Sequence, residues 1–155
     1  MKNQPRDTAE PFAGARLASK RQALHAFFSP RTVAVIGATE KKESVGARIM
    51  QNLISSFRGT IIPVHPTHTT VFHLPARPHI AEVAENVDLA IIVPPAPVVP
   101  DIVRACAQKG VPAAIIISAG FKETGVAGAS LEREIRQTAR ATGLRIVGPN
   151  CLGVM

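Results

Sequence analysis

The stretch TVAVIGATEKKESVGARIMQNLISS, residues 32–56, decides the fold. Thr32–Ile36 is a short aliphatic run, as expected of a strand that is buried on both faces of a parallel sheet. The polar loop Gly37–Gly46 follows, and Val45–Ser56 then carries apolar residues at helical spacing, with Ser44 placed to cap the helix. A strand, a loop containing glycine and an amphipathic helix, in this order, predict the first half of a βαβ unit.

The same alternation continues through the rest of the chain. Further strands are predicted at Thr60–Val64, Asp88–Val93, Pro112–Ser118 and Leu144–Val147. Helices are predicted at Arg21–Phe28, Ile80–Glu85, Val98–Lys109 and Ala129–Thr142. The less regular segment His65–His79 predicts a loop with a short extra strand near Val71–Leu74. Strands that alternate with helices pair in parallel through right-handed crossovers. The sequence therefore predicts a single α/β domain with a Rossmann-like, doubly wound parallel sheet.

Composition and charge narrow the classes of function. No apolar run reaches the roughly 18 residues of a membrane span, and the N-terminus lacks the apolar segment of a secretory signal. Two cysteines without metal-type spacing favour a cytoplasmic location and no metal site. The net charge is +7, but no long block of like charges occurs, which favours a local anion site over a nucleic-acid surface. Residues 1–20 are expected to form a flexible basic tail ahead of a domain at 21–155.

Ligands of a doubly wound sheet lie outside the carboxyl ends of its strands. The loops expected there are rich in Gly, Pro, Ser or Asn, and they are Gly37–Ser44, His65–His68, Pro94–Pro97, Ser118–Gly125 and Gly148–Gly153. In the first loop, the start of the helix offers unpaired N–H groups to a phosphate, and Lys41 and Lys42 add positive charge. Gly46 is expected to let a ligand or a strand approach the backbone. A plain turn with solvated lysines is the alternative.

The first loop matches neither the dinucleotide pattern GxGxxG nor the phosphate-binding pattern GxxxxGK[ST]. His65 follows the second strand, where an enzyme that binds NAD is expected to carry an acidic residue for the ribose. These features count against a nicotinamide cofactor. The histidines between 65 and 79 lack metal-ligand spacing and are expected to be solvated loop residues. Cys151 is expected to be a small buried residue instead of a nucleophile.

Several segments in order resemble one known family. SPRTVAVIGAT, IIPVHP, DLAIIVPPAPV, AAIIISAGFKETG and IVGPNCLGVM look like the N-terminal CoA-binding domain of NDP-forming acyl-CoA synthetases, among them the acetate–CoA ligases. The α subunit of succinyl-CoA synthetase is a more distant relative. The resemblance covers residues 24–155 and implies that the chain is the N-terminal piece of a longer acid–CoA ligase. It implies coenzyme A or acyl-CoA as ligand, further domains or subunits with a phosphohistidine and an ATP-grasp, ATP-binding fold, and no catalysis by this piece alone. It leaves a homo-oligomer open.

The resemblance also implies positions that bind coenzyme A. With Lys41, Lys42 and His65, which the family pattern does not supply, the candidate positions are Gly37, Ala38, Thr39, Lys41, Lys42, Ser44, Val45, Gly46, Val64, His65, Pro66, Val93, Pro94, Pro95, Ser118, Ala119, Gly120 and Asn150. The first loop would hold the nucleotide end, and Ser118 to Gly120 with Asn150 would lie towards the thiol. Two residues depart from the family pattern VNPK, since His65 replaces Asn and Thr67 replaces Lys. Lys41, Lys42 and His68 are candidates to compensate for the missing lysine.

Two other functions stay open at this point. The same domain could sense coenzyme A or acyl-CoA for an attached protein acetyltransferase, without ligase chemistry. A Rossmann domain that binds NAD(P) is the second alternative.

Overall fold

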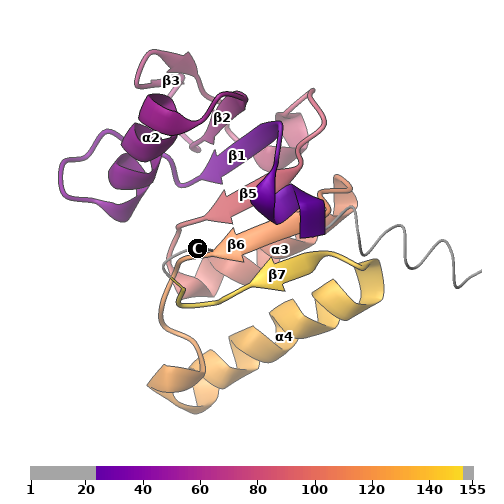
Figure 1. Ribbon diagram of the computed structural model, residues 1–155. Coiled ribbons are helices and arrows are strands. Elements are labelled where there is room, and N and C mark those ends of the chain that lie inside the picture. The colour runs from indigo at the N-terminus through magenta and orange to yellow at the C-terminus, as the bar shows by residue number, and fades with distance from the viewer. Residues whose placement is uncertain (1–23, 152–155) are drawn as a thin grey trace, which may run out of the picture.

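The computed structural model describes residues 24–151, which form one parallel sheet covered on both faces (Figure 1). The strands are β1 (Thr32–Ile36), β2 (Thr60–Val64), β5 (Leu89–Ile92), β6 (Ala113–Ile116) and β7 (Arg145–Val147). Their order in the sheet is β2-β1-β5-β6-β7, and all neighbours pair in parallel. In chain order this is 2-1-3-4-5, a doubly wound arrangement whose ligand crevice opens between the first and third strands. The predicted fold class is confirmed.

The helices divide between the two faces of the sheet. On one face lies α2 (Val45–Ser56), together with the helical residues 24–28. On the other face α3 (Val99–Gln108) and α4 (Val126–Thr142) pack side by side (Figure 1). Arg104 on α3 joins these two helices through an ion pair of 2.5 Å to Glu134 on α4.

Two apolar cores follow from the alternation of side chains along each strand. In β1, Ala34 and Ile36 face the core under α3, whereas Val33 and Val35 face the core under α2. All four side chains are buried, which accounts for the continuous aliphatic run of the sequence. The central strands therefore have no solvent face, and any ligand site must lie at their ends.

Most of the predicted elements are confirmed, and three of them, β1, α2 and β2, have the predicted bounds. Short 3₁₀ turns precede two helices, at η2 (Ala96–Val98) before α3 and η3 (Lys122–Thr124) before α4. The helix predicted at Ile80–Glu85 is only the turn η1 (Ile80–Glu82), because Val83 adopts an extended conformation and is buried in the core. The predicted basic tail, the first three residues of the first predicted helix and residues 152–155 lie outside the described residues.

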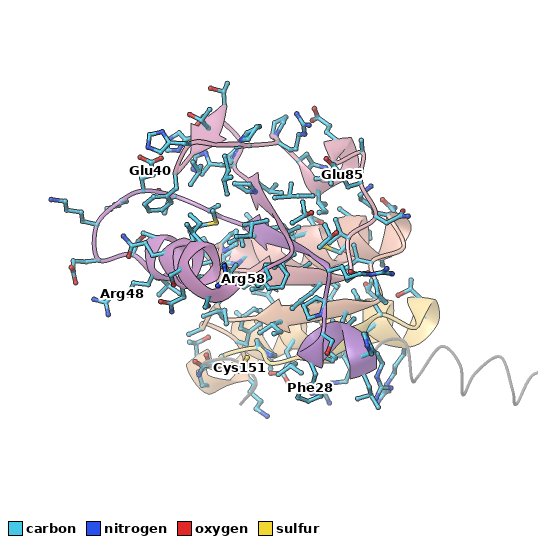
Figure 2. The ribbon with its side chains drawn as sticks, turned by 45° about the horizontal axis from the view of Figure 1, so that its top comes forward. Phe28, Glu40, Arg48, Arg58, Glu85 and Cys151 are labelled. Carbon is cyan, nitrogen blue, oxygen red and sulfur yellow. The ribbon has the colours of Figure 1, made fainter. Side chains whose placement is uncertain are left out.

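The short extra strand predicted near Val71–Leu74 is present as two strands, because the chain reverses inside this segment. Two short antiparallel strands, β3 (Thr70–Val71) and β4 (Leu74–Pro75), flank a turn in which Phe72 and His73 have φ of 48° and 62°. The Glu40 carboxylate, labelled in Figure 2, accepts the Phe72 N–H and so ties this turn to the loop after β1. Val71 is fully buried against the α2 side of the sheet.

We expect the core under α2 to depend on Met50, which is fully buried. Met50→Ala should lower the free energy of unfolding by about 2–5 kcal/mol, since it removes buried methylene groups and leaves a cavity. Ile54→Ala on the same helix is the matched control, because that side chain is 46% exposed. Urea unfolding of both variants measures the difference, and equal losses would contradict this account of the core.

Candidate functional site

A cleft of about 670 Å³ opens at the carboxyl edge of the sheet, where the loops after β1, β2 and β5 meet. This volume lies within the usual range of small-molecule sites. The cleft is at the crevice between β1 and β5 that the strand order predicts. Its walls are apolar for the most part and are formed by Ile36, Gly37, Thr39, Ser44, Val45, Gly46, Val64, His65, Pro66, Pro78, His79, Ile80, Val93, Pro94, Pro95, Val98 and Ile102.

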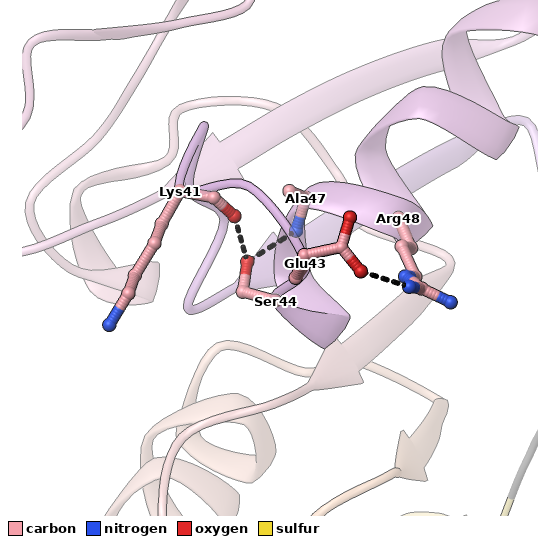
Figure 3. A network of polar contacts seen from close by, with 5 residues as sticks. All are labelled: Lys41, Glu43, Ser44, Ala47 and Arg48. Carbon is pink, nitrogen blue, oxygen red and sulfur yellow. Dashed lines mark hydrogen bonds and ion pairs between the residues drawn. The ribbon is translucent and has the colours of Figure 1, made fainter.

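The loop between β1 and α2 is held by its own hydrogen bonds. Ser44 caps α2, since its Oγ accepts the Ala47 N–H at 3.2 Å and donates to the Lys41 carbonyl at 2.7 Å (Figure 3). Glu43, at φ 64°, forms an ion pair of 2.7 Å with Arg48. The first N–H groups of the helix have no acceptor within the helix itself, and no acidic residue occupies its first turn. The helix start is therefore a positive, preformed end at the rim of the cleft.

Gly46 differs from its predicted role. A Cβ on Gly46 would lie 2.5 Å from the Gly37 carbonyl oxygen and 3.2 Å from the Thr39 methyl group. The space that a side chain would take at Gly46 is thus filled by the loop itself. Gly37 has φ 85°, and a Cβ there would lie 3.1 Å from the Pro94 ring. Glycine at both positions lets the helix start, the loop and the proline wall come together.

The proline wall is also fixed from its other side. Ser118, at the end of β6, is buried and donates its hydroxyl to the Pro94 carbonyl at 2.5 Å. The Ser118 carbonyl in turn accepts the Asn150 N–H at 2.9 Å. The loops after β5, β6 and β7 are therefore joined one to the next along the edge of the sheet.

Two histidines line the cleft at its β2 end. His65 Nδ1 accepts the backbone N–H groups of Thr67 at 3.3 Å and His68 at 3.1 Å, and its ring stacks on that of His68 with centroids 3.9 Å apart. His79 Nδ1 accepts the Ala81 N–H at 3.2 Å and so caps η1. Burial, and then the neighbouring His68 ring, lower the pKa of His65, so this imidazole is neutral at pH 7.

The structure brings together most of the residues that the sequence predicts for the site. Eleven of them line the cleft, and they are Gly37, Thr39, Ser44, Val45, Gly46, Val64, His65, Pro66, Val93, Pro94 and Pro95. Ala38 is buried in the core under α2 instead. Lys41 and Lys42 are exposed beside the cleft and do not line it. Ser118, Ala119, Gly120 and Asn150 lie farther along the edge, outside its lining.

Sequence reasoning missed a second wall, formed by Pro78, His79 and Ile80. These residues return to the cleft because the chain after the β3–β4 turn pairs with the end of β2. Arg77 donates its N–H to the Pro63 carbonyl at 3.0 Å and accepts the His65 N–H at 2.9 Å. No pattern in the sequence marks this short pairing. Three further lining residues that the sequence did not predict are Ile36, Val98 and Ile102. The one sequence signal for them is that they lie close to predicted loop residues.

The lining of the cleft carries few ionisable groups, and among the described residues these are His65 and His79. No Asp or Glu lines the cleft in the described part of the chain, so no carboxylate there can bind a ribose or act as a base. Within residues 24–151 no group of three His, Cys, Asp or Glu residues is arranged to hold a metal ion. Burial raises the pKa of the Cys106 thiol to about 12, which keeps it protonated and unreactive. None of the described helices is long and apolar enough to cross a membrane.

Comparison with known families gives one match over most of the chain. The family described as CoA binding domain matches residues 31–155.

Individual relatives are similar over the same region. An ADP-forming acetate–CoA ligase I of Archaeoglobus fulgidus is 47% identical over 132 residues, which are 85% of this chain and 19% of that protein. An ADP-forming 4-hydroxybutyrate–CoA ligase of Nitrosopumilus maritimus is 42% identical over 82% of this chain and 18% of its own length. Among solved structures, a similar one is acetyl-coenzyme A synthetase 1 of Ca. Korarchaeum cryptofilum, in complex with phosphate and ADP. Its sequence is 34% identical, and its fold matches with a TM-score of 0.80. The match covers 85% of this chain and 28% of that chain. The chain thus spans about a fifth of the length of these curated relatives.

The lowered pKa of His65 predicts how stability depends on pH. The unfolded chain binds a proton at this residue near pH 6.5, before the folded chain does. The contribution of His65 to the free energy of unfolding should therefore be constant above about pH 6.5. It should fall as the pH drops below that value. Urea unfolding at pH 7.5 and 5.5 measures the fall.

His65→Asn separates this contribution from those of the other titrating groups. An Asn Oδ1 can accept the same backbone N–H groups without titrating. The loss of stability between pH 7.5 and 5.5 should therefore be smaller in the variant than in the wild type. The same loss in both proteins would show that His65 does not carry the effect.

Proposed function

The chain belongs to the CoA binding domain family, in the form carried by NDP-forming acyl-CoA synthetases, and from this premise we propose that it binds coenzyme A in the cleft between β1 and β5. One observation carries the proposal, namely that apolar proline walls and the positive start of α2 face the same cleft. Among the described residues, no carboxylate lines this cleft. Coenzyme A combines an adenine ring and an apolar arm with phosphate groups, and such a cleft suits both parts.

The order of loops along the edge suggests how coenzyme A would lie. The nucleotide end would occupy the cleft near β1 and β2, with its phosphates towards the start of α2. The pantetheine arm would pass over Pro94 and Pro95. The thiol would then reach the loops after β6 and β7, near Ser118 and Asn150, which lie beyond the cleft along the same edge.

For the whole protein we propose an acid–CoA ligase that couples thioester formation to a nucleoside triphosphate. Residues 21–155 would be its CoA-binding domain, and partner domains or subunits would carry the phosphohistidine and the ATP-grasp fold. The domain would present the thiol and would not catalyse alone. Relatives named for acetate and for 4-hydroxybutyrate match this chain to a similar degree, so the acyl group would be chosen outside it. Two free cysteines agree with a location in the cytoplasm.

Ligand-induced thermal stabilisation tests the proposal directly. Coenzyme A at 100 times its Kd should stabilise the folded chain by about 2.7 kcal/mol, whereas NADH at the same concentration should have no effect. Differential scanning fluorimetry at several concentrations of each ligand distinguishes the two. Stabilisation by NADH and not by coenzyme A would contradict the proposed function.

Lys41 and Lys42 are exposed and lie three or four residues before the start of α2, whereas the nearby Arg48 is paired with Glu43. Lys41 extends its side chain away from the Ser44 cap, where it is free to meet a phosphate (Figure 3). At about 0.2–1 kcal/mol for each exposed ion pair, replacing both lysines with Ala should weaken coenzyme A binding by up to 30-fold or so at low salt. The difference should shrink as salt is added.

Lys109→Ala is the control for this experiment, because Lys109 lies in a groove with Arg31 at the opposite edge of the sheet. Isothermal titration calorimetry measures both proteins. Equal affinities of the double variant and the control would identify Lys41 and Lys42 as surface charges without a part in binding.

A further inference from the structure

The polar side chains that line the cleft are few, and most of their polar atoms are already engaged. They are Thr39, Ser44, His65 and His79. Thr39 Oγ1 accepts the Lys41 N–H at 3.2 Å, and the Ser44 hydroxyl both donates and accepts within the same loop. Thr39 and Ser44 therefore hold the loop together. The Thr39 hydroxyl and the two histidine rings remain as the side-chain groups able to donate to a ligand.

Both histidines are held in the same way, although they come from different segments. Backbone N–H groups donate to Nδ1 of His65 and to Nδ1 of His79. A ring nitrogen that accepts an N–H carries the lone pair, so a neutral imidazole in this state has its proton on Nε2. Stacking on His68 fixes the ring of His65 from one side. Each ring is thus preoriented by its backbone hydrogen bonds, with Nε2–H as its unused polar group.

We propose that His65 and His79 are specificity-determining residues of the cleft, each donating its Nε2–H to an acceptor on the nucleotide end of coenzyme A. This inference rests on the proposed function, in which that end lies near β2, where both histidines are located. Neither Lys nor Arg is among the described residues of the lining, so the Nε2–H groups of the histidines supply recognition inside the cleft. Inside the cleft, adenine and ribose would offer ring nitrogens and hydroxyl oxygens as acceptors. The phosphate groups of the ligand would stay at the rim of the cleft.

Asparagine separates this role from a structural one. An Asn Oδ1 accepts the backbone N–H two residues on, and Asn is a good cap at the start of a helix. His65→Asn and His79→Asn should therefore keep the loop and the cap while they remove the Nε2–H donors. His73→Asn is the matched control, since His73 lies outside the cleft lining in the β3–β4 turn, at a φ of 62° that Asn tolerates.

The test is calorimetric titration of the wild type, both single variants, the double variant and the control. Coenzyme A is one probe, and adenosine 3′,5′-bisphosphate, which is the nucleotide end without the diphosphate link and the arm, is the other. Each single variant should bind both probes about two- to tenfold more weakly, the range for removing one hydrogen bond. Thermal unfolding midpoints of the variants without ligand should match that of the control.

The outcomes separate the two proposals. If the wild type binds coenzyme A and the double variant binds it equally well, the role of the histidines is overturned and the proposed function stands. A loss of affinity for coenzyme A that is absent for the bisphosphate also overturns the inference, because the histidines would then contact the pantetheine arm. If the wild type does not bind coenzyme A, both proposals fail.

Discussion

The carboxyl edge of the sheet depends on one close approach, between the Gly37 carbonyl and the first turn of α2 at Gly46. A side chain on Gly46 would begin 2.5 Å from the Gly37 oxygen, so this packing requires glycine. Gly37 also turns the chain through a positive φ of 85° directly after β1 and packs on Pro94. Because these contacts are at van der Waals distance or closer, the start of α2 is fixed at the crevice between β1 and β5.

The electrostatics of the site follow from this packing. A helix start that is held against β1 provides a positive end without any charged side chain inside the cleft. The interior can then be mostly apolar, with prolines that offer no N–H groups on one side and the two histidine rings on the other. Glu40 adds a restraint from outside, since it accepts the Phe72 N–H and ties the first loop to the β3–β4 turn. The site is therefore preformed, and little ordering is left for the ligand to induce.

The sequence predicts those parts of this arrangement that depend on periodicity and on chain order. The alternation in Thr32–Ile36 and the cap at Ser44 predict the bounds of β1 and α2, because buried strands and capped helices have local signatures. The rule that ligands bind at strand ends then places the loops after β1, β2 and β5 together, and eleven residues predicted from these loops do line one cleft.

What the sequence does not predict depends on backbone geometry or on pairing over a distance. Phe72 and His73 adopt positive φ although neither is Gly or Asn. The turn between β3 and β4 therefore lacks the residue types from which such a turn is predicted. The wall at Pro78–Ile80 depends on Arg77 pairing with the end of β2, which no local pattern encodes. Likewise, a glycine in the sequence does not show which group packs against it. At Gly46 the group is the Gly37 carbonyl oxygen.

The same geometry separates binding from reaction. Along the edge, the cleft takes in the loops after β2, β1 and β5 and ends before Ser118. There the polar groups are used between loops, because the Ser118 hydroxyl donates to the Pro94 carbonyl and the Ser118 carbonyl accepts the Asn150 N–H. A ligand that starts in the cleft and is longer than it must leave its far end on an open surface. The carboxylate of Glu123 in the loop after β6 accepts the Gly120 N–H at 2.8 Å and so is also used within the loop. We infer that other parts of the whole protein complete the reaction centre around the end that this domain presents.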